Sequence, residues 1–394
     1  MPIYMDHAAT TPVRREVLDA MLPFLTESFG NPSSAHAFGR AARAALDDAH
    51  DRLASSLRVE PREVVFTSGG TEANNLALKG AAWAGKAHGH RIVTSSIEHH
   101  AVGHALRYLE KFGFEVVELP VDRYGRVDPD ELEAALTDRT ILVSIMLANN
   151  EVGTIQPVAE IVKRVRGRKG VLFHVDAVQA APYVDLDLEA LGADLVSLSG
   201  HKFEGPKGVG ALYVRHGTHI LAQQHGGEQE RHRRAGTENV AGAVGLAVAY
   251  ELCVAERPAT VKRLRSARER LAKAVLAVPG TELTGHPSAR LAGLLSIIAR
   301  GTDGSAVALS LDLEGIAVSV GSACTTGSTE VSHVLSAMGY PEDEARGALR
   351  LSLGRTTTDE EIATAIDVVP RVIASMQVGT ASVARDPLGQ GIGV

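Results

Sequence analysis

Lys202 is the residue of this sequence whose setting most directly suggests chemistry. It follows a mostly apolar run at 195–198, which predicts a short buried strand, and it precedes a glycine-rich turn and a second predicted strand at 211–214. A lysine held in a partly dry pocket has a lowered pKa and can act as an amine nucleophile, including in Schiff-base formation. Taken alone, Lys202 is more simply explained as a surface lysine beside a turn, so the hypothesis depends on the rest of the chain.

A glycine turn at 68–75, SGGTEANN, follows another predicted strand at 64–67 and opens a predicted helix. Backbone N–H groups and the positive end of the helix dipole converge at such a turn, and this arrangement suits a phosphate group. Two glycines before a helix are common in α/β folds, so the motif is only moderately specific.

Three further polar residues follow predicted strands. His99 lies just past a strand at 91–96, Asn150 follows a strand at 140–147, and Asp176 ends a mainly apolar run. Open α/β sheets bind ligands at the carboxyl ends of their strands, although a histidine that caps the next helix is the simpler interpretation of His99. A buried Asp176 needs a partner, and either a cationic pyridinium nitrogen or an arginine would serve.

The two cysteines of the chain call for different interpretations. Two cysteines cannot form a disulfide framework, which fits a reducing cytosol. Cys253 falls on an apolar helix face and is interpreted as an inert core residue. Cys324 lies in a small, polar, glycine-bounded stretch at 320–330, which predicts an exposed mobile loop. A free thiol on such a loop is unusual unless its reactivity is used, because exposed thiols oxidise.

The elements that have to position these residues alternate between strands and helices from residue 64 onward. This alternation predicts an α/β fold with a mixed, mostly parallel sheet flanked by helices. A long helical stretch at 237–273 follows, and a smaller α/β unit begins after Pro279. Near the N-terminus we expect a helix at 13–27 and a second one, capped by Ser33 or Ser34, that runs to about residue 57.

These patterns predict two domains and a tail. We expect a large domain at 13–259, a small domain made of 1–12 and 260–376, and a disordered tail at 377–394.

The composition argues against several classes of protein. It is 45% hydrophobic and 22% charged, as is ordinary for a soluble globular protein, and the net charge of −7 gives no case for binding nucleic acid or an anionic membrane. The longest apolar runs are far short of a bilayer span, and no signal peptide opens the chain. We therefore expect a cytoplasmic protein, without a metal site.

Taken together, the strand-end residues are those of a pyridoxal-phosphate site. Their order and spacing resemble fold-type I, the aspartate-aminotransferase-like superfamily, and within it the cysteine desulfurases of the class-V aminotransferase family. The matching motifs cover nearly the whole chain up to about residue 376. They are YMDHAATTP, FGNPSSAH, FTSGGTEANN, EHHAV, NNEVGTIQP, HVDAVQ, SGHKFEGPKGVGALYV, RAGTEN, GSAC and LRLSLGR. Each motif is weak alone, but all of them in this order make the resemblance specific.

The resemblance implies a cofactor role for each strand-end residue. Lys202 would bind pyridoxal phosphate covalently and move protons at the substrate Cα, Asp176 would pair with the pyridinium nitrogen, and His99 would stack on the ring. Gln179 would hydrogen-bond the phenolic oxygen, with Asn150 near it and near the substrate. The residues that would hold the phosphate are Gly70, Thr71, Ser199 and His201.

The resemblance also implies the substrate and the partners. Arg350 would bind the carboxylate of L-cysteine as a bidentate pair, helped by Asn31. Cys324 would take the substrate sulfur as a persulfide and leave L-alanine. Thr237 would reach the phosphate of a neighbouring subunit, which implies a homodimer. The expected sulfur acceptors are iron–sulfur scaffold or tRNA-thiolation proteins, with transient iron–sulfur ligation by Cys324.

Two features qualify this resemblance. Glu228 and His232 stand where the family pattern leads us to expect glycine or a small residue, which affects the loop on the dimer side. The GSAC stretch around Cys324 resembles the longer loop of the housekeeping and nitrogen-fixation desulfurases. The alternatives are a selenocysteine lyase on the same scaffold, a pyridoxal-phosphate aminotransferase in which Cys324 is idle, and a non-enzymatic scaffold protein. Intact Lys202 and Asp176 argue against the last.

Overall fold

A seven-stranded sheet forms the centre of the larger part of the molecule in the computed structural model, which describes residues 2–321 and 331–383. The strand order is β2-β8-β7-β6-β5-β3-β4. Only β8 runs antiparallel to its neighbours, so the predicted mostly parallel sheet is confirmed. The strands are β2 Val64–Thr67, β3 Arg91–Ser95, β4 Glu115–Leu119, β5 Thr140–Ser144, β6 Leu172–Asp176, β7 Leu195–Ser199 and β8 Gly210–Val214.

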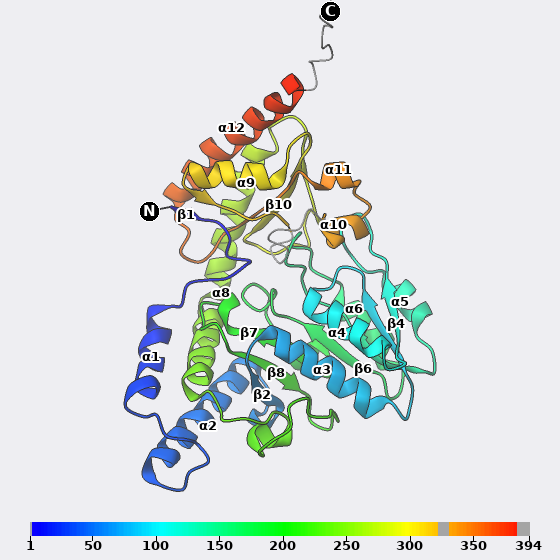
Figure 1. Cartoon of the computed structure of the whole chain (residues 1–394), viewed down its shortest axis with the longest axis vertical. Coiled ribbons are helices and arrows are strands. Elements are labelled where there is room, and N and C mark those ends of the chain that lie inside the picture. The colour runs from blue at the N-terminus through cyan, green and yellow to red at the C-terminus, as the bar shows by residue number, and fades with distance from the viewer. Residues whose placement is uncertain (1, 322–330, 384–394) are drawn as a thin grey trace, which may run out of the picture.

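Helices cover both faces of this sheet (Figure 1). The alternation of side chains along the strands shows which helices pack on each face. Val64 and Phe66 of β2 pack in a core with α2 Ala37–Leu57 and the first half of α8 Val240–Val275. Val65, between them, packs on the other face with α3 Gly70–Gly85 and α4 His100–Glu110. Successive residues of a strand point to opposite faces, so both faces need apolar side chains. The strands therefore read as short, nearly continuous apolar runs.

A second, smaller part holds a three-stranded antiparallel sheet in the order β12-β10-β9. Its strands are β9 Thr281–Leu283, β10 Leu294–Ala299 and β12 Ala348–Ser352, and β1 Ile3–Tyr4 pairs in parallel with β11 Ile316–Ala317 beside it. Met5 lies in the core of this part, so the N-terminal segment packs with residues from the C-terminal third.

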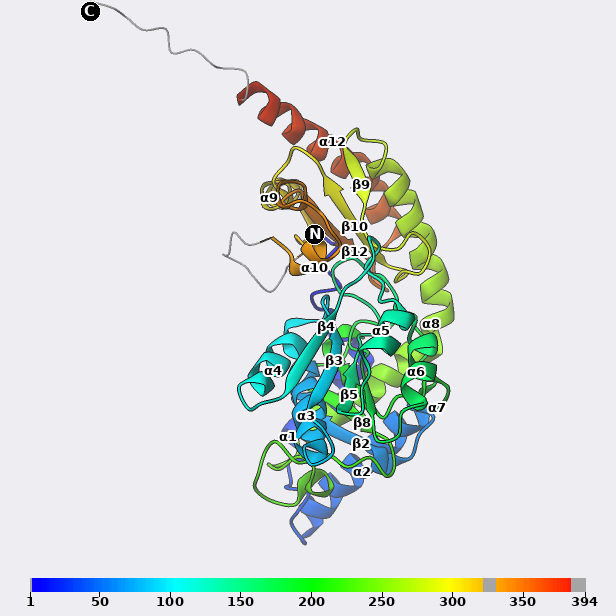
Figure 2. The ribbon, with the colours of Figure 1, turned by 90° about the vertical axis from the view of Figure 1, so that its right-hand side faces the viewer.

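One helix, α8, joins the two parts. It contributes Leu246 to the core of the larger part and Leu264 and Leu271 to the core of the smaller one. Figure 2 shows α8 running along one side of both. A domain division near residue 259 stays a proposal, since it would fall inside this helix.

Two boundaries differ from the sequence-based expectation. The predicted cap of α2 at Ser33 or Ser34 is wrong, because the helix begins later, at Ala37, and the His36 Nδ1 atom accepts a hydrogen bond from Gly39 N at 3.2 Å. The predicted tail from residue 377 is also wrong at its start, because α12 Asp359–Val383 continues past it. Adding a residue to a formed helix costs less free energy than nucleating a new one. The helix can therefore continue into residues that would not start a helix by themselves. Residues 384–394 lie outside the described part of the chain.

The remaining elements are short or peripheral to the cavity described below. None of the helices in the described ranges is long and apolar enough to cross a membrane. These elements are α1 Arg15–Thr26, α5 Pro129–Ala135, α6 Val158–Arg166, α7 Leu188–Leu191, α9 Gly304–Leu313, α10 His333–Ala337, α11 Glu342–Ala345 and the 3-10 turns η1 Pro61–Glu63, η2 Gly200–Lys202 and η3 Gln229–His232.

Candidate active site

A cavity of about 290 Å³ opens where the parallel strands β3, β5, β6 and β7 end. Carboxyl ends of parallel strands are the usual place for a ligand in such sheets. The wall also takes residues from the N-terminal segment, the first turn of α3 and β12. The lining residues are Ala8, Ala9, Gly70, Thr71, Asn74, His99, Ala101, Met146, Ala148, Asn150, Asp176, Val178, Gln179, Ser199, His201, Lys202 and Arg350.

Three predicted site residues are not among these. The turn between α1 and α2 lies at the end of the molecule opposite α12 (Figure 1). Asn31 is exposed in this turn, and its Oδ1 atom accepts a hydrogen bond from Ser33 N at 2.9 Å. The structure therefore does not bring Asn31 to Arg350 within one chain, because local turn chemistry holds it elsewhere. Thr237 lines a separate cavity of about 200 Å³. Cys324 lies outside the described residues.

Lys202 is held at the cavity by the N-terminal segment. Its Nζ atom donates hydrogen bonds to the carbonyl oxygens of Ala8 at 2.6 Å and Ala9 at 2.9 Å. The turn around it is tight, since a Cβ on Gly205 would lie 2.8 Å from the Gly200 carbonyl oxygen. The predicted position of Lys202 on a short strand-end loop is confirmed.

Asp176 is a buried carboxylate, only 5% exposed, that is held by neutral partners. Its Oδ1 atom accepts a hydrogen bond from Val178 N at 2.9 Å, and its Oδ2 atom accepts one from Asn74 Nδ2 at 2.7 Å. In the part of the chain that the structure describes, no arginine forms an ion pair with it. The arginine alternative is therefore wrong within these residues, and the carboxylate can meet a cationic ligand.

His99 caps a helix and also lies at the cavity, so it occupies both of the positions weighed from the sequence. Its Nδ1 atom accepts a hydrogen bond from Ala101 N at 3.1 Å and so caps α4, while its ring lines the cavity. Burial lowers the pKa of His99, helped by the Lys202 charge and opposed by the Asp176 charge. A neutral ring whose Nδ1 accepts carries its proton on Nε2.

The first turn of α3 presents bare backbone to the cavity. A Cβ on Gly70 would lie 2.7 Å from Val178 Cγ2, so no side chain fits there. The free N–H groups of a helix start suit an anion. His201 lines the same cavity, and burial together with Lys202 and Lys207 lowers its pKa to about 4, which leaves it neutral.

Several polar atoms of the cavity wall have no partner in the described residues. They are Asn74 Oδ1, Gln179 Oε1 and Arg350 Nε, although each is buried. Arg350 is 1% exposed and donates from Nη1 to Asn150 O at 3.0 Å and from Nη2 to Asp6 Oδ1 at 2.8 Å. Buried polar groups are normally hydrogen-bonded, so unpaired ones around a cavity indicate a polar ligand.

Sequence reasoning missed three contributors to this site. Asn74 has a usable signal, because it lies four residues after Gly70 on one helix and so shares its face. No sequence signal points to the carbonyl groups that hold Lys202 or to the Asp6 carboxylate that holds Arg350. These contacts join residues that are far apart in the sequence.

Comparisons with known proteins agree with this geometry. The family described as Aminotransferase class-V matches residues 3–364. The cysteine desulfurase IscS of Methanosarcina thermophila is 51% identical over 95% of this chain and 93% of its own length, and that of Dictyoglomus turgidum is 48% identical over 95% of each. A solved structure described as a NifS-like protein has a TM-score of 0.90 at 39% identity, covering 95% of this chain and all 100% of that one.

This chain is therefore a member of the aminotransferase class-V family, whose fold-type I enzymes depend on pyridoxal phosphate. Within that family it belongs with the cysteine desulfurases. The residues present fit the cofactor, since the unpaired Gln179 oxygen, the bare start of α3 and an Asp176 carboxylate without a cationic partner among the described residues all line one cavity.

Proposed function

We propose that this protein is a cysteine desulfurase that converts L-cysteine to L-alanine and receives the sulfur on Cys324. The observation that carries the proposal is the convergence of Lys202, Asp176 and Arg350 on one cavity in a member of the desulfurase family. Pyridoxal phosphate, when bound, supplies an electron sink that acidifies the substrate Cα.

The residues of the chain divide the remaining work. Asn74 and Val178 hold the Asp176 carboxylate, which would pair with the ring nitrogen of the bound cofactor and favour its protonated form. The amine of Lys202 would hold the cofactor covalently and, once substrate has displaced it, would move the proton of the substrate Cα. Arg350 binds the substrate carboxylate through N–H groups that Asp6 and Asn150 do not use. Those two residues accept hydrogen bonds from only two of its five N–H groups.

Cys324 provides the acceptor for sulfur. Its thiolate attacks the substrate sulfur, an S–S bond forms and the substrate Cβ–S bond breaks, with the electron pair staying on the substrate. A proton then completes L-alanine, so that one thiol and one L-cysteine give one persulfide and one L-alanine. The nucleophile has to be the thiolate, which a hydroxyl group cannot replace.

The partners follow from the same proposal. A second copy of the chain would supply Thr237, which in its own chain lines a cavity apart from Lys202. Large apolar side chains of α1 and the loop after it are exposed, among them Leu25 at 58% and Phe29 at 69%, and this fits a covered surface in a homodimer. Sulfur acceptors would be iron–sulfur scaffold or thiolation proteins in the reducing cytoplasm, where the Cys324 thiol persists.

Replacing each cysteine in turn tests the proposal. Cys324→Ser should abolish L-alanine formation from L-cysteine, and Cys253→Ser is the matched control that should keep it. Selenium leaves more easily than sulfur, so Cys324→Ser should retain much of its activity on selenocysteine. The assay is L-alanine release from both substrates. If Cys324→Ser desulfurates L-cysteine at the rate of the unchanged protein, the persulfide step is wrong.

A further inference from the structure

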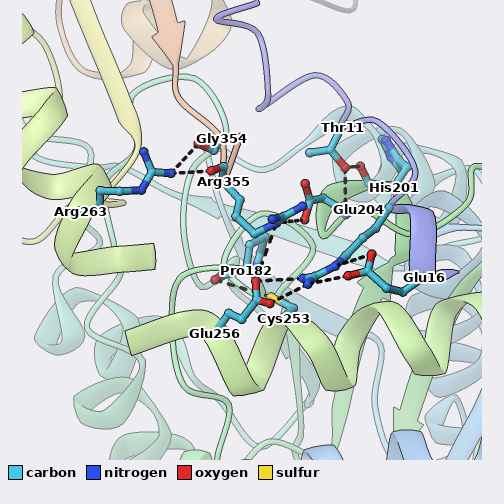
Figure 3. Close-up of polar contacts among 11 residues, drawn as sticks. Thr11, Glu16, Pro182, His201, Glu204, Cys253, Glu256, Arg263, Gly354 and Arg355 are labelled. Carbon is cyan, nitrogen blue, oxygen red and sulfur yellow. Dashed lines mark hydrogen bonds and ion pairs between the residues drawn. The ribbon is translucent and has the colours of Figure 1, made fainter. Parts of the chain in front are cut away.

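Thr11 lies in the N-terminal segment beside the Lys202 loop, and no step of the chemistry above uses it. The side chain is buried, with only 7% exposed. Its Oγ1 atom donates a hydrogen bond to His201 O at 2.9 Å and accepts one from Glu204 N at 2.9 Å. Figure 3 shows Thr11 together with these two residues. One hydroxyl group therefore binds the backbone of the loop both before and after Lys202.

Further contacts join the same two segments. Thr11 N donates a hydrogen bond to His201 O at 3.0 Å. The amine of Lys202 donates to the carbonyl oxygens of Ala8 and Ala9. The N-terminal segment thus holds the backbone of the loop at one point and the end of the lysine side chain at another, so it fixes the path of the side chain between them.

The backbone of Glu204 needs this support. Its φ of 62° lies in the left-handed region, which is uncommon for a residue other than glycine. Such a conformation persists where the surrounding structure fixes it from several sides. Here Thr11 accepts from the Glu204 N–H group, and the Glu204 carbonyl oxygen accepts from Arg14 N at 3.0 Å. Loss of the Thr11 hydroxyl group would remove one of these contacts, two residues from Lys202.

The start of the N-terminal segment is bound to the smaller part of the molecule. Asp6 Oδ1 accepts a hydrogen bond from Arg350 Nη2 at 2.8 Å, and Ala8 N donates one to Ser352 Oγ at 2.8 Å. Residues 6–11 therefore connect the arginine that would bind the substrate carboxylate with the loop of the lysine. The contacts at the arginine do not involve Thr11, so a change at Thr11 should disturb the lysine more than the arginine.

We propose that Thr11 is a positioning residue for Lys202. It fixes the loop at 200–204 so that the amine approaches the cofactor and, later, the substrate Cα from one defined place. This inference rests on the proposed role of Lys202. A reacting group loses rate steeply when it is misplaced, so the position of the loop should affect proton transfer more than substrate binding.

The test compares Thr11→Val, Thr11→Ser and Thr11→Ala with a matched control, Thr154→Val. Thr154 is fully buried and does not line the cavity. Its Oγ1 atom makes the same pair of contacts, because it donates to Tyr124 O at 2.6 Å and accepts from His286 N at 2.9 Å. Valine keeps nearly the shape of threonine and removes both hydrogen bonds in either place.

Two measurements report on the lysine itself. In the first, pyridoxal phosphate is added to the full chain stripped of cofactor, borohydride is added after increasing times, and the pyridoxyl label on Lys202 is quantified by peptide mapping. In the second, the holoenzyme exchanges the Cα hydrogen of L-alanine with D₂O over a range of L-alanine concentrations. This exchange needs a base at the substrate Cα but no sulfur transfer.

We expect Thr11→Val to slow the labelling of Lys202 and the maximal rate of Cα exchange by about 10- to 100-fold, the size of effect that a misplacement of about 1 Å produces. The half-saturating concentration of L-alanine should change little, because other residues hold Arg350. Thr11→Ser keeps the hydroxyl group and should recover most of the loss. Thr154→Val should leave both rates close to those of the unchanged protein, even where it lowers stability.

Thr11→Ala carries the test if Thr11→Val fails to fold. The smaller side chain leaves room for a water molecule that can bridge the two backbone groups, and the rates should fall in the same direction. Equal rates in Thr11→Val, Thr11→Ala and the unchanged protein would overturn the inference. Equal losses in Thr11→Val and Thr154→Val would also overturn it, because any buried threonine would then have the same effect.

Failure of the inference and failure of the proposed function are told apart by the unchanged protein. If Lys202 carries no label there, the proposed function is contradicted and the inference falls with it. If Lys202 is labelled and Thr11→Val is labelled as fast, only the role of Thr11 is wrong. Neither measurement depends on whether Cys324 accepts sulfur.

Discussion

Lys202 lies between two hollows of the molecule that hold their buried carboxylates in different ways. On one side is the cavity at the strand ends, and on the other is a crevice between the start of α1, the middle of α8 and the turn after β12. In the crevice, opposite charges are joined directly, as Figure 3 shows. Glu256 accepts two hydrogen bonds from Arg14, at 2.6 and 2.9 Å, and Glu204 accepts one from Arg355 at 2.6 Å.

The crevice also contains a cysteine, whose thiol is unreactive. Cys253 is half-buried and packs against the larger core, and burial raises the pKa of its thiol to about 11. A thiol in that state is protonated at neutral pH and unreactive. In the cavity, by contrast, the Asp176 carboxylate is held by two neutral donors, the Asn74 side chain and Val178 N. A carboxylate paired with an arginine joins two elements, whereas one held by neutral donors at a cavity can meet a cationic ligand.

The largest expected contrast concerns the two lysines of the glycine-rich segment. Borohydride reduction followed by peptide mapping should place a pyridoxyl group on Lys202, and Lys202→Ala should have no detectable turnover, because the amine is needed for both binding and proton transfer. Lys207→Ala, from the same segment, is the control and should stay active and labelled. A label on another lysine would show that the wrong side chain has been assigned.

A carboxylate from each hollow gives the next contrast. Asp176→Asn should keep part of the cofactor binding but lower kcat by about two orders of magnitude or more, because a neutral amide cannot hold a proton on the ring nitrogen. Glu256→Gln, in the crevice, should keep kcat close to that of the unchanged protein. Absorbance and L-alanine release measure the two effects. Near-normal turnover in Asp176→Asn would mean that the ring nitrogen is protonated by another group.

Burial of the Cys253 thiol in the crevice should slow its reaction with an alkylating reagent. With a pKa of about 11 instead of 9.0, Cys253 should react with iodoacetamide at pH 8 about 100-fold more slowly in the folded protein than in urea. Its rate should rise steadily as the pH approaches 11. Because the folded value is the higher one, the contribution of this thiol to folding stability is present below pH 9 and is lost as pH rises through 11. Equal rates in both states would contradict the burial.

The smallest expected effect belongs to the ion pairs of the crevice. Arg355→Ala should lower the free energy of unfolding by no more than about 1 kcal/mol, since the guanidinium is partly exposed and such pairs contribute little. Its kcat should be unchanged. Urea denaturation and L-alanine release check the two statements. A large loss of kcat with normal stability would show that Arg355 acts in catalysis and not only in the packing of the crevice.

The sequence predicted the cavity well where the signal was local. Asp176 ends an apolar run, and Lys202 and His99 follow shortly after one, and parallel strands bring such ends to one edge without further information. The sequence did not predict contacts between distant residues, such as the one between Asp6 and Arg350. It also did not predict the cap at His36, because that cap depends on the exact residue at which the helix begins. Asn31 was assigned to the substrate by resemblance, yet within one chain its side chain serves the turn that contains it.

Of the two departures from the family pattern, the one at His232 falls in the left-handed part of η3 and the one at Glu228 does not. Glu230, Arg231 and His232 have φ of 45°, 55° and 65°, a region that favours glycine, whereas Glu228 is at −90°. The buried Glu230 carboxylate holds this turn, since its Oε2 atom accepts from Phe66 N at 3.0 Å and lies 3.1 Å from His50 Nε2. A glycine at 232 would fit the backbone with less strain.

The continuity of α8 has a consequence for how the molecule unfolds. A helix of 36 residues is about 54 Å long, and its two halves are buried in different cores. Melting either core strips the apolar face of one half and weakens the helix that the other core needs. The two parts should therefore lose structure in a single cooperative transition. A cut at residue 259 would divide α8 and remove Met5 from the core that Leu264 and Leu271 help to form, instead of yielding two independent folding units.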